Sequence, residues 1–509
     1  MLKRIRTLLI ALHLYLGVAL CLLFVVWFVS GIAMAYYRSP VLTDATRLAF
    51  AEPLSDTPAV QRPAAVPGLA AQWSEVETLR LAQWGGRPLY RWLTRDSGWQ
   101  SAWADDGSAA RFDAAALRAE AQRWLETDRI EYRGAWQAAG QWSYFSAARA
   151  HYPLHRYSSG GWAAREVLLS SRTGEVVVAT TLPSRLLYYL GPGLHYLSFY
   201  PIRNDDPLWR GLVNWSSGLG AAACLFGLVL GLWRLRWHAD HTDRRLIPYT
   251  RFWMYWHHWT GLAFGSFTLT FVLSGLFSMN PAKIFPPTEI PDPLQQAWRG
   301  PAPPLEAVPA LGGAGHRPGL REYEYRRIRG AQFSVAVGEA GDQRLFQWQG
   351  ANWRPRPPFT AAELRALLQP VSPARIVGHR WLRQFDTYYY ARKERAQPLP
   401  ALRVELGDAR RTWLYLEPAS GRLFLRSDQG TRTRRWLYNG LHSLDFPFLL
   451  ARERLWEVVI WLLSLCGLAL SVTSTVIAWK WLRRRSRARA AATTPSRHAR
   501  LEPAAVDSR

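Results

Sequence analysis

The sequence predicts a membrane α-helical bundle of four spanning helices, built by a two-fold internal duplication, with two large α+β domains outside the membrane. Four apolar windows reach the roughly 20 residues that a helix needs to cross a hydrocarbon core. They lie at about 8–36, 211–233, 252–279 and 456–481. Two stretches of about 170 residues lie between the first and second windows and between the third and fourth, and both carry charges, prolines and turn signals throughout.

Residues recur at matched positions in the two halves. His13, Gly17, Ser30 and Gly31 match His257, Gly261, Ser274 and Gly275 at one shared offset. The segment Gly193-Leu-His195-Tyr-Leu-Ser-Phe199 matches Gly440-Leu-His442-Ser-Leu-Asp-Phe446 at an offset larger by three residues. Each copy therefore reads as a spanning helix, a large domain, a GLHxLxF segment and a second spanning helix.

The expected organisation has eight segments. They are a first spanning helix at 1–37, a first outer domain at 38–210, a second spanning helix at 211–237, a loop at 238–250, a third spanning helix at 251–280, a second outer domain at 281–452, a fourth spanning helix at 453–482 and a basic tail at 483–509.

Basic residues give the expected orientation, because short cytoplasmic segments hold the excess of Lys and Arg. They precede the first span, fill the loop between spans two and three, and follow the fourth span. We therefore expect a multi-pass protein of a bacterial inner membrane with both termini cytoplasmic and both large domains periplasmic. The net charge of +25 is concentrated in these segments, so we expect contact with membrane lipid and no nucleic-acid partner.

Within the outer domains, the patterns predict helices near 74–83, 114–126 and 360–368 and hairpins over 166–179 and 413–425. The three cysteines, Cys21, Cys224 and Cys466, fall inside spans and indicate neither a disulfide framework nor a cysteine-based metal site. The glycines of 312–315 are expected to form a flexible linker, and His238 and His241 a solvated loop.

The two hairpins, each leading through a GLHxLxF segment into a spanning helix, resemble the PepSY-associated transmembrane family of bacterial inner-membrane proteins. The most specific motifs are Gly440 to Phe446, the His257-x3-Gly261 start of the third span and the Glu417-Pro-Ala-Ser-Gly421 turn. The resemblance covers nearly the whole chain. It implies that the outer domains are PepSY-like and that the protein takes part in iron acquisition, since some members are haem-bearing reductases of ferric siderophores.

An ionisable side chain inside a span is costly and usually serves a site in the bundle interior. Together with the resemblance, this predicts that His13 and His257 are the axial ligands of a haem b. Gly17 and Gly261 each lie one turn beyond their histidine, where a missing side chain makes room for the macrocycle. The alternative is that these glycines serve close helix packing and that His13 hydrogen-bonds near the interface.

The remaining conspicuous histidines leave more than one interpretation open. His258 points about 100° away from His257 around the helix, so it contacts a propionate, ligates a different haem or lies against headgroups. His195 and His442 hold the iron of a second haem b, or a metal, at the outer surface, or they belong to interfacial helices and pack against their own domains. His151 and His155 are expected to share no metal, because Pro153 interrupts a helix between them.

The resulting functional prediction is a haem-dependent ferric-chelate reductase that passes electrons from quinol, or another donor, to a periplasmic ferric siderophore. Arg432, Arg434 and Arg435 are the predicted substrate-binding residues, through charge-assisted hydrogen bonds to an anionic chelate. The alternative is a non-redox PepSY membrane protein that binds a peptide or protease or assists siderophore transport. No flavin or nicotinamide site is expected, because no GxGxxG stands between a strand and a helix.

Overall fold

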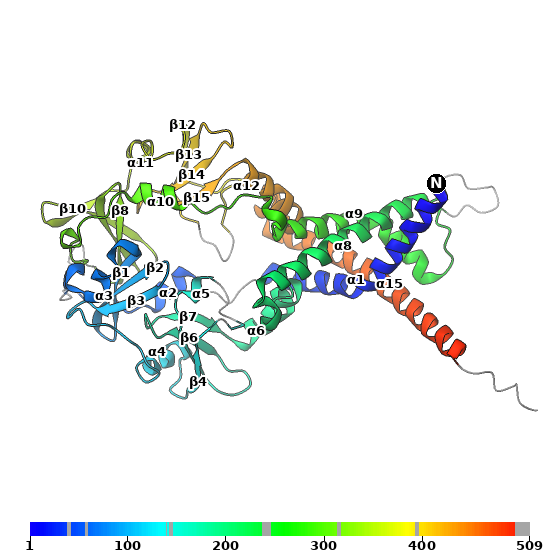
Figure 1. The fold of residues 1–509 in the computed structure, drawn as a ribbon, viewed down its shortest axis with the longest axis horizontal. Coiled ribbons are helices and arrows are strands. Elements are labelled where there is room, and N and C mark those ends of the chain that lie inside the picture. Colours follow the sequence, from blue (N-terminus) through cyan, green and yellow to red (C-terminus); the bar gives the residue numbers. More distant parts are fainter. Residues whose placement is uncertain are drawn as a thin grey trace, which may run out of the picture. The chain divides into compact units, whose positions relative to one another are not determined.

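The computed structural model describes residues 1–37, 42–55, 60–138, 140–141, 146–236, 246–312, 317–391 and 397–493 (Figure 1). Its contacts divide the chain into two compact units. The first contains Met1–Ala35, Arg210–Met279 and Arg452–Arg509, and the second contains Tyr36–Trp209 and Asn280–Ala451. Most of the loop expected at 238–250, including His238 and His241, lies outside the described residues, as do 313–315 and the tail from 494 onward.

The first unit consists of four long helices, which makes this a multi-pass membrane protein. They are α1 (Leu2–Tyr36), α8 (Asp206–Trp233), α9 (Phe252–Ser278) and α15 (Glu453–Thr493). Their most apolar windows have mean hydropathies of 2.6, 1.7, 1.5 and 2.0. The shortest has 27 residues, and at about 1.5 Å per residue it exceeds a hydrocarbon core of about 30 Å. Helix α15 continues well past the expected end at 482, because its Arg/Ala-rich continuation favours helix.

Aromatic side chains and glycines pack the four helices together. Phe24 and Phe28 of α1 form a cluster with Ala221 of α8 and Val272 of α9. A Cβ atom at Gly467 of α15 would overlap the Phe28 ring, so glycine is needed where these helices meet. Small residues at helix contacts are typical of membrane bundles, where packing rather than burial from water drives association.

The second unit contains three antiparallel sheets (Figure 1). The seven-stranded sheet has the order β11-β10-β9-β8-β1-β2-β3, and the two four-stranded sheets have the orders β4-β5-β6-β7 and β12-β13-β14-β15. The strands of the first stretch are β1 (Val76–Trp84), β2 (Arg87–Thr94), β3 (Gly98–Trp103), β4 (Glu131–Trp136), β5 (Leu154–Ser158), β6 (Glu166–Ser170) and β7 (Val176–Thr180). Those of the second are β8 (Leu320–Ile328), β9 (Ala331–Gly338), β10 (Gln343–Gln349), β11 (Asn352–Arg356), β12 (Ile376–Leu382), β13 (Ala401–Leu406), β14 (Trp413–Glu417) and β15 (Arg422–Ser427).

The seven-stranded sheet joins the two stretches that the sequence suggested were separate domains. Strand β1 pairs with β8, placing Leu79 opposite Tyr325 and Leu81 opposite Tyr323. Without this pairing both strands would leave a row of backbone groups unpaired at a sheet edge. The pairing also buries these four side chains in one core. The outer regions 38–210 and 281–452 therefore form one unit, and the helix expected near 74–83 is instead strand β1.

Each four-stranded sheet follows a helix that packs in its core. Helix α4 (Ala116–Leu125) contributes Leu117 and Leu125, which pack with Val167 and Leu169 of β6. Helix α11 (Ala361–Leu368) starts with a capping box between Thr360 and Glu363. These helices and the hairpins β6–β7 and β14–β15 are at the positions that the sequence predicted.

The segments that lead into α8 and α15 have the same order of elements. The first contains α6 (Leu182–Tyr188), the π-helix η3 (Tyr189–Gly193) and α7 (Tyr200–Arg203). The second contains α12 (Gln429–Arg434), the π-helix η6 (Arg435–Gly440), α13 (Leu441–Ser443) and α14 (Pro447–Leu450). Leu197 and Leu444, two residues after the GLHxLxF histidines, both adopt left-handed backbone conformations with φ of 51° and 53°.

Short helices complete the second unit and its connections. They are α2 (Asp44–Phe50), η1 (Pro63–Ala65), α3 (Pro67–Ala70), η2 (Trp73–Glu75), α5 (Ser146–Arg149), η4 (Pro281–Lys283), α10 (Asp292–Arg299) and η5 (Leu305–Ala307).

Candidate functional site

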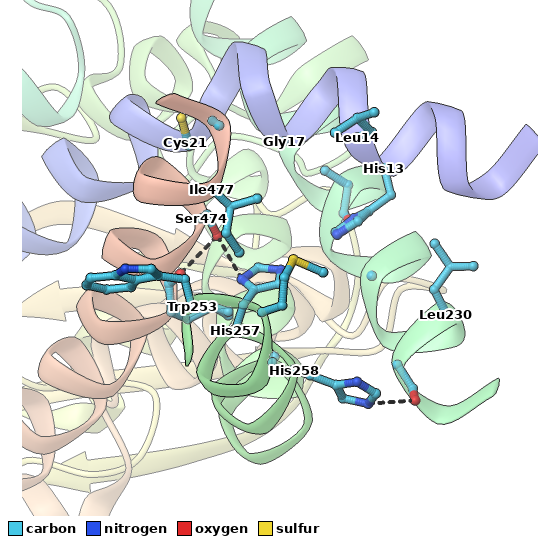
Figure 2. A pocket seen from close by; sticks show the side chains of 18 of the residues that line it. His13, Leu14, Gly17, Cys21, Leu230, Trp253, His257, His258, Ser474 and Ile477 are labelled. Carbon is cyan, nitrogen blue, oxygen red and sulfur yellow. Dashed lines mark hydrogen bonds between the residues drawn. The ribbon is translucent and has the colours of Figure 1, made fainter. Parts of the chain in front are cut away.

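Two histidines from different spans face each other inside the membrane unit. His13 lies on α1 and His257 on α9, and their ring centres are 6.2 Å apart with 35° between the ring planes (Figure 2). An imidazole nitrogen lies about 1.1 Å from its ring centre and binds a metal at about 2 Å, so two rings on opposite sides of one ion have centres roughly 6 Å apart. The observed separation is compatible with one ion held by both rings.

The Nδ1 atoms of both rings are engaged by neighbouring helices. His13 Nδ1 is 3.0 Å from the carbonyl oxygen of Ala223 on α8. His257 Nδ1 is 3.3 Å from the hydroxyl oxygens of Thr473 and Ser474 on α15. A metal-binding histidine commonly uses its second nitrogen in this way, which fixes the ring and directs the other nitrogen to the metal. Because Nδ1 of each ring has these contacts, a metal between the rings would bind Nε2.

A cavity of about 860 Å³ surrounds the two rings, and helices α1, α8, α9 and α15 all contribute to its lining. Gly17 and Gly261 both line it, and a Cβ atom at Gly17 would have no neighbour within 4 Å. At Gly261 the nearest atom would be Leu470 Cδ1 at 3.8 Å. These two glycines therefore border open space, which disfavours the alternative that they serve close helix packing.

Two glycines of α8 that we did not single out from the sequence bring the helices close to the histidines. A Cβ atom at Gly227 would lie 2.6 Å from His13 Cε1, so only glycine admits this ring. A Cβ atom at Gly231 would lie 4.0 Å from His258 Nε2. Their spacing of four residues places both on one helix face, a signal that was available in the sequence.

His258 lines the same cavity but points away from the His13–His257 pair (Figure 2). Its side chain is 7% exposed, and its Nε2 is 3.0 Å from the carbonyl oxygen of Gly231. Its ring also packs against Tyr249, with 5.4 Å between ring centres. The different direction follows from its position one residue after His257, about 100° around the helix.

The second unit contains a further histidine pair. The ring centres of His195 and His442 are 6.0 Å apart, with 63° between the ring planes. Each histidine lies two residues after the end of a π-helical turn, a rare local structure that often occurs at functional sites. The separation again matches two imidazoles that share one ion. The structure thus brings together the two pairs that the matched sequence positions singled out.

The three arginines predicted to bind a chelate mostly serve the fold. Arg432 donates to the carbonyl oxygens of Ser427 at 3.1 Å and Arg411 at 2.8 Å. Arg435 is 6% exposed and donates to the carbonyl oxygens of Thr387, at 3.0 Å, and Asp445. Arg434 lies over the ring of Tyr438, 5.1 Å from its centre. Backbone carbonyls thus take up part of the Arg432 and Arg435 guanidinium groups, while Nη1 of Arg435 has no hydrogen-bond partner among the described residues. The role of these arginines in chelate binding stays a prediction.

His151 and His155 lie in different environments, in keeping with the expectation that they share no metal. His151 stacks on Trp99 with 5.5 Å between ring centres, whereas His155 Nδ1 is 2.9 Å from the hydroxyl oxygen of Tyr132. Burial is the main cause that lowers the pKa of His151 to about 4. It is therefore a neutral side chain at physiological pH.

A buried network of ion pairs near His151 was not predicted from the sequence. Arg47 of α2 binds Glu322 of β8 through two contacts of 2.8 and 2.9 Å, and Arg91 of β2 lies 3.1 Å from Glu175. Burial alone would raise the pKa of Glu175, but the charges of Arg91 and Arg47 outweigh burial and lower it to about 2. Because Glu175 and Glu322 come from the two different stretches, the network holds the second unit together.

Among the described residues, no group of three or more His, Cys, Asp and Glu side chains gathers as a metal site. Each of the two histidine pairs offers two imidazoles. Two axial ligands are what a haem iron requires from a protein, since the macrocycle supplies the other positions.

Comparison with known proteins gives the family of this chain. No curated protein matches it. The family model of the PepSY-associated TM region matches residues 10–370, which is more than half of the chain and includes His13, His195 and His257. The protein therefore belongs to the family that is defined by the PepSY-associated transmembrane region.

Proposed function

We propose that this protein is a haem-dependent oxidoreductase of a bacterial inner membrane, which passes electrons from quinol to the periplasm and there reduces a ferric siderophore or another ferric chelate. The observation that carries the proposal is the pair of ring separations, 6.2 Å for His13 and His257 and 6.0 Å for His195 and His442. Both separations suit two imidazoles on one iron. The cavity around the first pair, which is apolar along most of its lining, suits a flat macrocycle.

In the membrane site, His13 and His257 would hold the iron of one haem b. Ala223, Thr473 and Ser474 would orient the two imidazoles through Nδ1, and Gly17 and Gly261 would leave room for the ring edge. When bound, a haem of this kind takes up and releases one electron at a time. The apolar side chains of the four helices would exclude water from it, and this environment and the axial ligands would tune its potential.

His195 and His442 would hold the second haem b. The hydrocarbon core is about 30 Å thick, and an electron does not cross that distance efficiently from one haem near the cytoplasmic face. A second haem near the outer face would therefore be needed as a relay. The basic residues at the helix ends support a topology in which both termini would be cytoplasmic and the second unit periplasmic. Reduction there would release iron from the chelate as the more weakly bound ferrous ion.

We also infer that the two halves of the chain are copies of one unit. The matched histidines, the two π-helical turns and the two left-handed leucines support this inference. So do Ser30 and Ser274, which occupy matched positions and each donate to the carbonyl oxygen four residues earlier. Each copy would contribute one histidine to each site. When the two copies pack together, each iron would then have two histidine ligands.

The test is a reduced-minus-oxidised absorbance spectrum of the purified protein. We expect bands of two b-type haems, and a featureless spectrum would reject the redox function in favour of the non-redox alternative. His13→Ala and His257→Ala should each remove most of one haem from a folded, inserted protein. His155→Ala is the control and should keep both haems. Full haem retention in both ligand variants would reject the assignment of these two residues.

A further inference from the structure

The cavity around His13 and His257 is basic at one end. Arg234, Arg251, Lys480 and Arg484 all line it, whereas no Asp or Glu does. In the part of the chain that the structure describes, none of these four side chains forms an ion pair with a carboxylate. Arg234 directly follows the end of α8 and Arg251 directly precedes α9, whereas Lys480 and Arg484 lie within α15, and all four line the same cavity.

Position along the helices places these cations to one side of the histidine pair. Lys480 and Arg484 lie six and ten residues beyond Ser474, the residue that contacts His257, which is about 9 and 15 Å along α15. Arg251 lies six residues before His257, about 9 Å along α9. The apolar stem of a long basic side chain can lie along the cavity wall while its charged end extends beyond the stem. The charged ends can therefore reach a ligand bound beside the histidine pair.

The neighbouring arginines of α15 show that a position in this basic segment does not by itself put a cation in the cavity. Arg483 lies over the Trp479 ring at 4.7 Å and Arg485 over the Trp481 ring at 5.0 Å, and neither lines the cavity. Lys480 and Arg484 share one helix face because they are four residues apart. Lys480 and Arg484 therefore line the cavity, whereas Arg483 and Arg485 of the same helix do not.

We propose that Arg234, Arg251, Lys480 and Arg484 bind the carboxylates of the ligand in this cavity, which under the proposed function are the two propionates of the haem held by His13 and His257. This inference rests on the proposed function and assigns the direction of the ligand: its carboxylates lie at the basic end. Charge-assisted hydrogen bonds of this kind are about twice as strong as neutral ones. The same cations would suit the phosphate of an anionic lipid, so the experiment must separate the two sources of negative charge.

The experiment compares haem with its dimethyl ester, which has the same macrocycle and no free carboxylate. Apoprotein from haem-deficient cells is reconstituted with each ligand, and the dissociation rate is followed by transfer to excess apomyoglobin. The test variant is Lys480→Gln with Arg484→Gln, a second variant is Arg234→Gln on another helix, and the control is Arg483→Gln with Arg485→Gln.

We expect the wild-type protein to release the ester about 10- to 100-fold faster than haem, because one or two charged contacts are each worth about a tenfold change. The test variant should release haem faster by a similar factor and should lose most of its discrimination between haem and ester. The control variant should behave as the wild type. These readouts are binding rates and do not depend on reductase activity.

Three results would overturn the inference. Wild-type protein that binds haem and its ester equally well has no carboxylate contact, and a variant that weakens both ligands equally acts through the fold. If the effect of the substitutions vanishes in nanodiscs of zwitterionic lipid and appears only with anionic lipid, the cations bind headgroups instead. Wild-type protein that binds neither ligand rejects the proposed function itself, which separates the two failures.

Discussion

Removing Arg47 from its buried pair with Glu322 should be among the most destabilising single substitutions in the second unit. Both guanidinium nitrogens of Arg47 contact the carboxylate, and the two side chains are only 17% and 5% exposed. Burial alone would raise the pKa of Glu322, but the charges of Arg80 and Arg47 hold it below its ordinary value. The carboxylate is therefore ionised, and Arg47→Met leaves that charge buried with fewer partners.

The expected magnitude follows from what remains around Glu322. Removal of one partner from a buried ion pair costs about 3–5 kcal/mol of unfolding free energy. Because the charge of Arg80 still acts on Glu322, we expect the lower end of that range, about 3 kcal/mol, for Arg47→Met. Replacing both residues, as in Arg47→Met with Glu322→Met, removes the stranded charge and should recover most of the loss.

The assay is urea unfolding of the detergent-solubilised protein, followed by tryptophan fluorescence. Arg95→Met is the matched control, because Arg95 forms a 2.9 Å pair with Asp292 in which the side chains are 60% and 59% exposed. That exposed pair should contribute little to stability, because solvent and salt screen it. The reasoning is refuted if Arg47→Met is no more destabilising than Arg95→Met, or if the double substitution is less stable than Arg47→Met alone.

Four further predictions concern acid stability, the membrane cavity, the relay and the topology. Since burial lowers the pKa of His151 to about 4, the unfolded chain binds a proton that the folded one does not, so stability should fall by up to about 3 kcal/mol between about pH 6.5 and 4, and His151→Gln should flatten that fall. Gly227→Ala should lower haem content, because its Cβ would lie 2.6 Å from His13 Cε1, whereas Gly218→Ala, on the same helix but outside the cavity lining and with nothing within 4 Å of its Cβ, should leave haem content unchanged; equal pyridine-haemochrome values would contradict this. His442→Ala should leave the membrane haem reducible by quinol yet abolish chelate reduction, and unchanged reduction in this variant and in His195→Ala would defeat the relay. Alkaline phosphatase fused after Gly319 should be active and after Asp240 inactive, and the reverse pattern would invert the proposed orientation.

The sequence by itself determined the four spanning helices, because a run of apolar residues long enough to cross a membrane is a local property of the chain. It also singled out His13, His257, His195 and His442, because matched positions in two halves are visible without any contact being known. The helices α4 and α11 and the hairpins β6–β7 and β14–β15 were likewise predictable from periodicity and turn residues. The helices and hairpins depend on residues close together in the chain, and the matched histidines depend on a comparison of the two halves of the sequence.

Only the tertiary structure decided how distant residues meet. The pairing of β1 with β8 joins residues about 240 positions apart, and no local pattern indicates which edge strand will find which partner. The same holds for the bidentate contact between Arg47 and Glu322 and for the Ala223 carbonyl beside His13, since every residue carries a carbonyl and most arginines lie at the surface. The contacts of Gly227, Arg432 and Arg435 also depend on which side chain or carbonyl the fold places beside them, so the sequence alone did not show these contacts.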